Sequence, residues 1–296
     1  MRFAVALLVL TIPARANTFY LTVAGLGGEP DYEQRFAMLA SETEKTLKAH
    51  APEASVETLK GAAATRENIR AAFGRIALAA KPQDALVVLL IGHGTFENGY
   101  KFNLPGPDLS AAELAGFMDK VPAGRQLVVN TSSSSGGGNE ALRHANRILI
   151  SATKTGSEKN ATVFARYWVE ALSDPSTDTD KNGSISAMEA FRFAERKTKG
   201  FYDEQKRLST EHAVIEDSVK GGAAGQLAMT FSVVKLDAES LSADPAKRAL
   251  QAKRDQVEAQ IDQLKYQKLL LAPDMYRTQL SKLLLELARV QEELDK

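Results

Sequence analysis

Five short apolar segments in the first two-thirds of the chain predict buried strands. The run ALVVLLI (85–91) contains no polar residue, which is typical of a strand covered on both faces of a parallel sheet. Residues 18–24 (TFYLTVA) and 55–60 (SVETLK) are rich in β-branched and aromatic residues, as strands are. Shorter apolar stretches at 126–129 and 147–152 complete the set.

Helical patterns fill the intervals between these strands. A helix is predicted over residues 31–50, a second begins after the N-cap residue Thr65, and a third opens at Ser110. Strands that alternate with helices predict an α/β fold: an open, mostly parallel sheet with helices on both faces. Ligands of such sheets bind beyond the carboxyl ends of the strands. Two unusual loops lie there, GHGTFENG after 85–91 and TSSSSGGG after 126–129.

The last fifty residues follow a different pattern. Apolar residues recur there at alternating spacings of four and three, at Tyr276, Leu280, Leu283, Leu287, Val290 and Leu294. This heptad rhythm, after a weaker stripe at residues 250–264, predicts a coiled-coil helical hairpin over 244–296. The hairpin either packs on its own domain or offers a seam for self-association or a protein partner. Arg254 and Lys268 interrupt the first stripe and favour the former.

Charge and the amino terminus narrow the classes of partner. Lys plus Arg and Asp plus Glu both number 37, so the chain has no net charge to attract nucleic acid or an anionic membrane. Residues 1–16 combine Arg2, an apolar core and Ala14-Arg15-Ala16, which predicts a cleavable signal peptide. No later segment is long enough for a membrane span. We therefore expect a periplasmic or secreted protein that starts at Asn17.

The stretch DTDKNGSISAME (178–189) has the spacing of an EF-hand-type calcium loop. Loop positions one, three, five and twelve carry oxygen ligands, position six is Gly183, and position seven offers a backbone carbonyl. Ile185 at position eight is the apolar residue that ties such loops to a core. We predict a structural calcium site formed by Asp178, Asp180, Asn182, Ser184 and Glu189. The alternative is a polar turn without an ion.

Gly92-His93-Gly94 stands at the end of the most apolar segment. Flanking glycines allow close approach of a backbone, and a general base needs such an exposed strand end. The amide of Gly94 suits an oxyanion site. His212, in LSTEHAVIED, lacks metal-ligand spacing and is interpreted as structural.

The serine- and glycine-rich loop at 131–138 has three interpretations. It is a flexible connector, a nest of amides that binds an anion, or a turn that presents a nucleophile. No GKS or GKT follows, so it is not a phosphate loop. Only the third interpretation uses the histidine of the neighbouring loop.

Together, GHG after one buried strand and x-Ser-Gly after the next resemble the caspase-haemoglobinase fold, and more closely its legumain-type cysteine peptidases. The resemblance covers residues 18–234 and includes ISATKTGSEKNATVFARYWVEAL and TEHA. It implies that His93 takes the place of the catalytic base and Gly94 that of the oxyanion amide. The family's pattern acid-Ala-Cys-x-Ser-Gly falls on residues 131–136, so Ser133 stands where the cysteine belongs and Thr131 where the acid belongs.

This departure leaves open whether the chain is an enzyme. The chain has no cysteine, and a serine hydroxyl needs its base within direct hydrogen-bond reach, whereas a thiol is partly ionised near neutral pH. We expect a 17–236 domain that is catalytically silent, stabilised by calcium, and that interacts through its helical tail. The alternative is an active serine peptidase with a Ser133–His93 dyad; a third is a module that binds anions or peptides with the serine loop alone.

Overall fold

The computed structural model describes residues 16–217, 225–236, part of 249–264, and 271–294. Its centre is a six-stranded sheet with the order β10-β8-β7-β3-β1-β2. Five strands run parallel, and β10 pairs antiparallel with β8 at one edge. The strands are β1 (Thr18–Ala24), β2 (Ser55–Leu59), β3 (Ala85–Ile91), β7 (Arg125–Asn130), β8 (Arg147–Ser151) and β10 (Val214–Asp217). The predicted open, mostly parallel sheet is confirmed.

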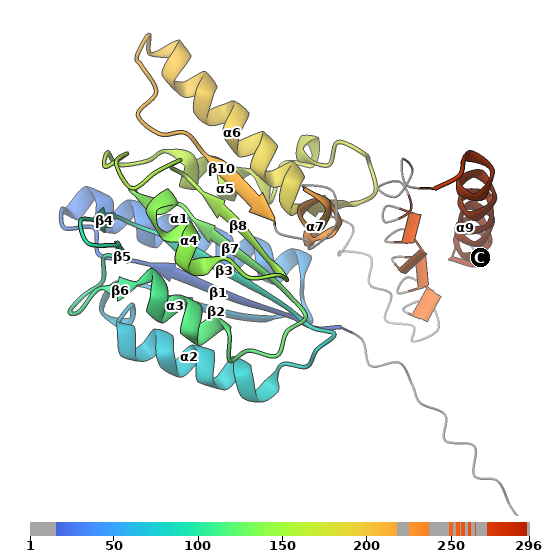
Figure 1. The fold of residues 1–296 in the computed structure, drawn as a ribbon, viewed down its shortest axis with the longest axis horizontal. Coiled ribbons are helices and arrows are strands. Elements are labelled where there is room, and N and C mark those ends of the chain that lie inside the picture. Colours follow the sequence, from blue (N-terminus) through green and yellow to red (C-terminus); the bar gives the residue numbers. More distant parts are fainter. Residues whose placement is uncertain are drawn as a thin grey trace, which may run out of the picture.

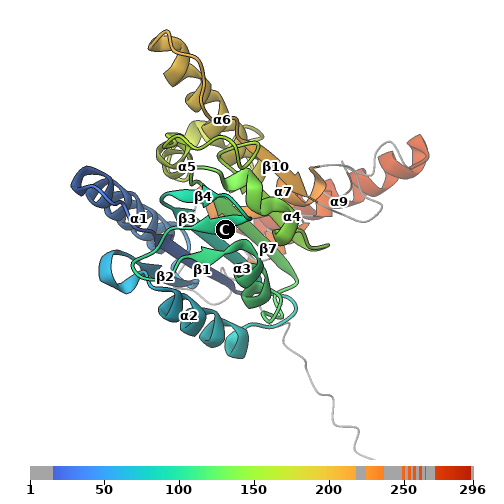
Figure 2. The same ribbon diagram turned by 60° about the vertical axis from the view of Figure 1, so that its left-hand side comes forward.

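Helices cover both faces of this sheet (Figures 1 and 2). One face packs on α1 (Pro30–His50), α5 (Phe164–Ala171) and α6 (Ala187–Glu204), and the other on α2 (Arg66–Ala79) and α3 (Ala111–Met118). The run ALVVLLI divides between them: Val87, Leu89 and Ile91 face the first group, and Leu86, Val88 and Leu90 face the second. Burial on both faces explains why this strand has no polar position. Two short helices, α4 (Asn139–Leu142) and α7 (Gln226–Thr230), lie in connections.

Three helices begin at the side-chain caps that their sequences contain. Thr65 accepts a hydrogen bond from the backbone N–H of Asn68 at the start of α2. Ser110 and Glu113 form a capping box at α3, as Ser186 and Glu189 do at α6. Each cap satisfies N–H groups that the first helical turn leaves without a partner.

Two small sheets were not predicted. In the first, β4 (Gly94–Phe96), β5 (Tyr100–Phe102) and β6 (Leu109–Ser110) pair antiparallel above the carboxyl end of β3. In the second, β9 (Ser184–Ser186) pairs with β11 (Ser232–Lys235). The strands have two to four residues each, too few for a period in the sequence to stand out.

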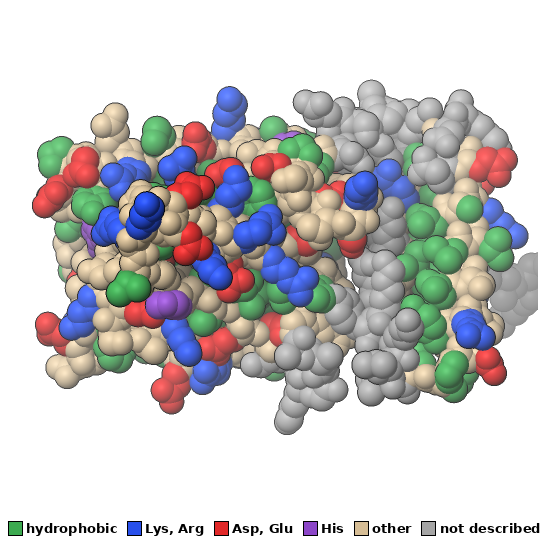
Figure 3. All heavy atoms as spheres, turned by 90° about the horizontal axis from the view of Figure 1, so that it is seen from above, with side chains coloured by type: hydrophobic (Ala, Val, Ile, Leu, Met, Phe, Trp, Pro, Cys, Tyr) green, Lys and Arg blue, Asp and Glu red, His purple; other side chains and the backbone are tan. Residues whose placement is uncertain are grey.

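The predicted hairpin lies partly outside the described residues. Its second helix, α9, spans Pro273–Leu294, and hydrophobic side chains gather along it (Figure 3). Val257, Ile261, Leu264 and Val290 are buried, and Lys253 Nζ lies 3.5 Å from a Glu286 carboxylate oxygen. These contacts agree with two helices that pack on each other. Most of the first predicted helix lies outside the described residues, so the domain boundaries stay predictions. Residues 1–15 of the predicted signal peptide are likewise not described. Among the described residues, no helix is long and apolar enough to cross a membrane.

Candidate functional site

The strand order brings the two unusual loops together. Because β3 lies between β1 and β7, the loops that follow these three strands meet at the carboxyl edge of the sheet. The order also reverses between β1 and β3, since β2 lies on one side and β7 on the other, and such a switch point is where open α/β sheets bind ligands. His93 follows β3 at this point, and Ser133 follows β7 beside it.

The serine turn, residues 131–135, is tightly packed. Ser132, Ser133, Ser134 and Ser135 are all between 0% and 3% exposed. Ser134 has φ +56°, in the left-handed region that non-glycine residues rarely adopt, and its buried Oγ has no hydrogen-bond partner. Strained backbone and unsatisfied buried polar atoms concentrate at functional sites. The turn is therefore not a flexible connector.

The Ser133 hydroxyl is bound to the backbone of Gly94. The Gly94 N–H donates to Ser133 Oγ at 3.1 Å, and Ser133 Oγ donates to the Gly94 carbonyl at 3.1 Å. A Cβ on residue 94 would lie under 3.0 Å from the Ser133 carbonyl and the Tyr100 ring, so this close approach requires glycine. The residues that follow β3 and β7 thus lie side by side. The amide that the resemblance assigns to the oxyanion is occupied by the serine itself.

His93 lies in an aromatic setting instead. Its half-buried ring makes edge contacts with Tyr32, at 4.6 Å between centroids, and with Phe36, at 5.1 Å. Burial lowers the pKa of His93, while the Gly27 carbonyl and the carboxylates of Asp31 and Glu29 act in the opposite direction. Desolvation prevails, so the imidazole is neutral near pH 7. Within the described part of the chain, no hydrogen bond joins the His93 ring to Ser133 Oγ.

A buried polar network supports the turn from beneath. The Tyr100 hydroxyl contacts Ser132 Oγ at 2.6 Å and donates to Asn130 Oδ1 at 3.1 Å. Burial strongly raises the pKa of Tyr100, so the phenol stays protonated and available as a donor. Tyr100 could not be singled out from the sequence, because one tyrosine in a three-residue strand carries no pattern.

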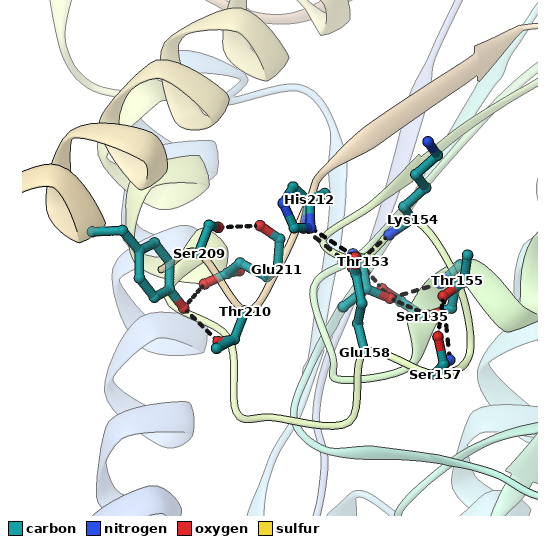
Figure 4. Close-up of polar contacts among 12 residues, drawn as sticks. Ser135, Thr153, Lys154, Thr155, Ser157, Glu158, Ser209, Thr210, Glu211 and His212 are labelled. Atoms are coloured by element: carbon teal, nitrogen blue, oxygen red, sulfur yellow. Dashed lines mark hydrogen bonds and ion pairs between the residues drawn. The ribbon is translucent and has the colours of Figure 1, made fainter. Parts of the chain in front are cut away.

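Residues 153–163, after β8, fasten the turn from the other side (Figure 4). The Glu158 carbonyl accepts from the Ser134 N–H at 2.8 Å, and Thr153 Oγ1 accepts from the Gly136 N–H at 3.0 Å. The Glu158 carboxylate in turn contacts His212 Nδ1 at 2.7 Å. The interpretation of His212 as structural agrees with this pairing, since the contact ties together segments 54 residues apart.

Glu211, next to His212, is a buried acid that the sequence did not single out. It is 2% exposed, and its two carboxylate oxygens accept from the Val163 N–H at 2.8 Å and the Phe164 N–H at 3.2 Å, at the start of α5. The Tyr202 hydroxyl of α6 also donates to it, at 3.0 Å. Burial raises the pKa of Glu211. The TEHA segment is thus a clamp on α5, α6 and the loop beside the serine turn.

The three glycines after the serines are required by packing. A Cβ on Gly136 would collide with the backbone of Thr153 and Lys154. On Gly137 it would meet the ring of Phe96, and on Gly138 the ring of Tyr100. Neighbouring loops and aromatic rings therefore fill the space around this segment.

The predicted calcium ligands converge in a single loop. One carboxylate oxygen from each of Asp178, Asp180 and Glu189 lies within 4.8 Å of the others. Asn182 Oδ1 accepts from the Ser184 N–H at 2.9 Å, so residues at positions five and seven belong to the same turn. Gly183 has φ +78°, as a sharp turn at position six requires. Carboxylates this close repel one another, and a donor set made of oxygen fits a hard divalent cation.

The loop is anchored to β11. β9 lies within residues 178–189 and pairs with β11, and the Leu236 N–H donates to the Gly183 carbonyl at 2.8 Å. Ile185, the residue at position eight, is fully buried, as expected. Glu189 accepts from the Thr179 N–H at 2.8 Å through one oxygen and from the Ser186 N–H at 2.9 Å through the other.

Comparisons with known proteins find similarity among solved structures and none among family models or curated proteins. The fold and the site together define the class of protein: an open α/β sheet with a buried serine turn and a histidine loop at its carboxyl edge. No protein-family model matches the chain, and no curated protein matches it. Among solved structures, the chain is similar to the crystal structure of caspase-1 from Spodoptera frugiperda, with 13% sequence identity and a TM-score of 0.48, over 68% of this chain and 86% of that chain.

Proposed function

We propose that this chain is a caspase-like, peptidase-type protein that binds peptide or protein ligands at the serine turn without hydrolysing them. The observation that carries the proposal is the double hydrogen bond of the Ser133 hydroxyl to the Gly94 backbone. A serine acts as a nucleophile only when a base takes its proton directly, and here the proton is directed to a carbonyl. Ser133 is also only 3% exposed, so a substrate carbonyl has no path to its hydroxyl in this state.

An active serine peptidase is the second candidate. The lowered pKa of His93 favours it, because only the neutral imidazole accepts a proton. For this reaction Ser133 Oγ has to leave both Gly94 contacts and reach the His93 ring.

Labelling the mature protein with a fluorophosphonate probe separates the two candidates. We expect no labelling of wild type, and none of the Ser133→Ala or His93→Ala variants. Labelling of wild type that both substitutions abolish would establish the serine peptidase and contradict our proposal.

We further propose that residues 178–189 bind calcium as a structural ion. The support is the oxygen donor set and the mutual repulsion of the three carboxylates, which a divalent cation would neutralise. Bound at this loop, the ion would hold β9 and the start of α6 together. Its role would be to stabilise the fold and not to take part in a reaction.

Thermal melting with and without calcium tests the site. A ligand present at 100 times its dissociation constant stabilises the folded state by about 2.7 kcal/mol, so millimolar calcium should raise the melting temperature of wild type over that in chelator. Glu189→Gln should remove most of this difference. Equal melting of wild type in both conditions would rule the site out.

Two further proposals concern the location of the protein and its interactions. We propose that residues 1–16 are removed on export to the periplasm or the medium, and that the helical tail binds a partner or a second copy. Mass spectrometry of the protein from its native host tests the first: a mature chain that starts at Asn17 supports it, and one that retains residues 1–16 refutes it.

A further inference from the structure

The ring of Phe96 occupies a slot between two glycines of different loops. Gly137 follows β7 and Gly156 follows β8, and a Cβ on either would lie under 3.0 Å from ring carbons of Phe96. A Cβ on Gly137 would also lie 3.0 Å from the Cα of Gly156, so the two glycines adjoin each other as well as the ring. Neither glycine has a positive φ. They are glycines because a flat ring lies against them, and not because of their backbone conformation.

Phe96 reaches this slot from the end of β4. Residues 97–99, which join β4 to β5, are exposed, as is Thr95, whereas Phe96 is half-buried. The second strand of the hairpin is held firmly, since Tyr100 and Phe102 are buried and Tyr100 binds Ser132. The ring of Phe96 is half-buried, so the slot opens to solvent on one side. The β4–β5 hairpin thus places one aromatic side chain against the loops that follow β7 and β8.

The slot adjoins the serine turn. Gly137 is four residues after Ser133, and Gly156 lies in the loop whose Glu158 carbonyl binds the Ser134 N–H. Gly94, which holds the Ser133 hydroxyl, opens the strand that ends at Phe96. Rotation of the Phe96 side chain away from the two glycines would vacate the slot beside the turn, while the pairing of β4 with β5 and the contact of Tyr100 with Ser132 stay in place.

We propose that the slot between Gly137 and Gly156 is a binding subsite for an aromatic side chain of a peptide ligand, and that Phe96 is its resident occupant. Two Cβ-free residues offer flat apolar contact to a planar ring, and a ring buries a large apolar area. An incoming aromatic residue competes with Phe96 for the slot. The inference rests on the proposed function, since it names the ligand class of the same site.

The test compares wild type with Phe96→Ala, using two capped tripeptides, Gly-Phe-Gly and Gly-Ala-Gly. Phe96→Ala should bind the phenylalanine peptide at least tenfold more tightly than wild type does, because the competitor is gone. It should also prefer that peptide at least tenfold over the alanine peptide. Titration calorimetry measures both ratios. Equal affinity of Phe96→Ala for the two peptides would overturn the proposal.

A second variant and a second ligand separate a binding site from a simple hole. Gly156→Ala in the Phe96→Ala background places a methyl group in the slot and should abolish the gained binding, while the melting temperature reports that the double variant folds. An enclosed cavity would bind benzene but not a capped peptide, because the peptide backbone needs an exit. Benzene binding without peptide binding therefore contradicts the proposal. Mass spectrometry of the recovered peptide tests the proposed function separately. Cleavage of the peptide would contradict catalytic silence but would not contradict the aromatic subsite.

Discussion

The four serines of the turn have four different environments. Ser132 Oγ contacts the Tyr100 hydroxyl, Ser133 Oγ the Gly94 backbone and Ser135 Oγ the Thr153 hydroxyl, whereas Ser134 Oγ is buried without a partner. The sequence predicts Ser133 beside the GHG loop, and in the structure its hydroxyl contacts Gly94. It does not decide which partner the hydroxyl takes, because that depends on the side-chain rotamer and on shifts of a few tenths of an ångström.

His93 gives a prediction at the same scale. Since burial lowers its pKa, the unfolded chain binds a proton more readily than the folded one, and the free energy of unfolding falls as pH drops below about 6.5. Above that value both states carry a neutral ring and the effect vanishes. We expect His93→Gln to lose less stability than wild type between pH 7 and pH 5. Denaturant unfolding measures it, and parallel stability curves for the two proteins would show that burial does not govern this ring.

At the scale of elements, the strands buried on both faces were the most predictable. Residues 85–91 form β3 as predicted. β7 is longer than the predicted stretch by one polar residue at each end, Arg125 and Asn130, and both pair with β3. The pairs β4–β5 and β9–β11 were not predicted, because these short strands are stabilised by contacts with loops distant in the sequence. The spacing of the proposed calcium loop is recognisable in the sequence because its candidate ligands are local.

The helical tail has both buried and exposed apolar residues. The buried residues Val257, Ile261 and Val290 show that part of the heptad stripe is covered within the chain, while Leu284 and Leu285 of α9 are 48% and 62% exposed. If the tail mediates association, deleting 244–296 should lower the number of chains per particle, measured by light scattering, with the α/β domain still folded. A full-length protein that is monomeric and captures no partner would support a hairpin that packs only on its own domain.

At the scale of the whole molecule, alternating strands and helices were enough to predict an open sheet covered on both faces. They were not enough to predict the strand order or the antiparallel edge strand β10. Both depend on long-range pairing, and β10 has only four residues, all of them half-exposed. The resulting order places the loops after β1, β3 and β7 side by side, so the location of the site follows from topology more than from any motif.

The central claim is that the Ser133 hydroxyl is bound to the backbone and not to a base. A high-resolution crystal structure of the mature protein measures this directly. We predict Ser133 Oγ at about 3.1 Å from both the nitrogen and the carbonyl oxygen of Gly94. A Ser133 Oγ within about 3.2 Å of a His93 ring nitrogen would contradict the account and identify a serine peptidase.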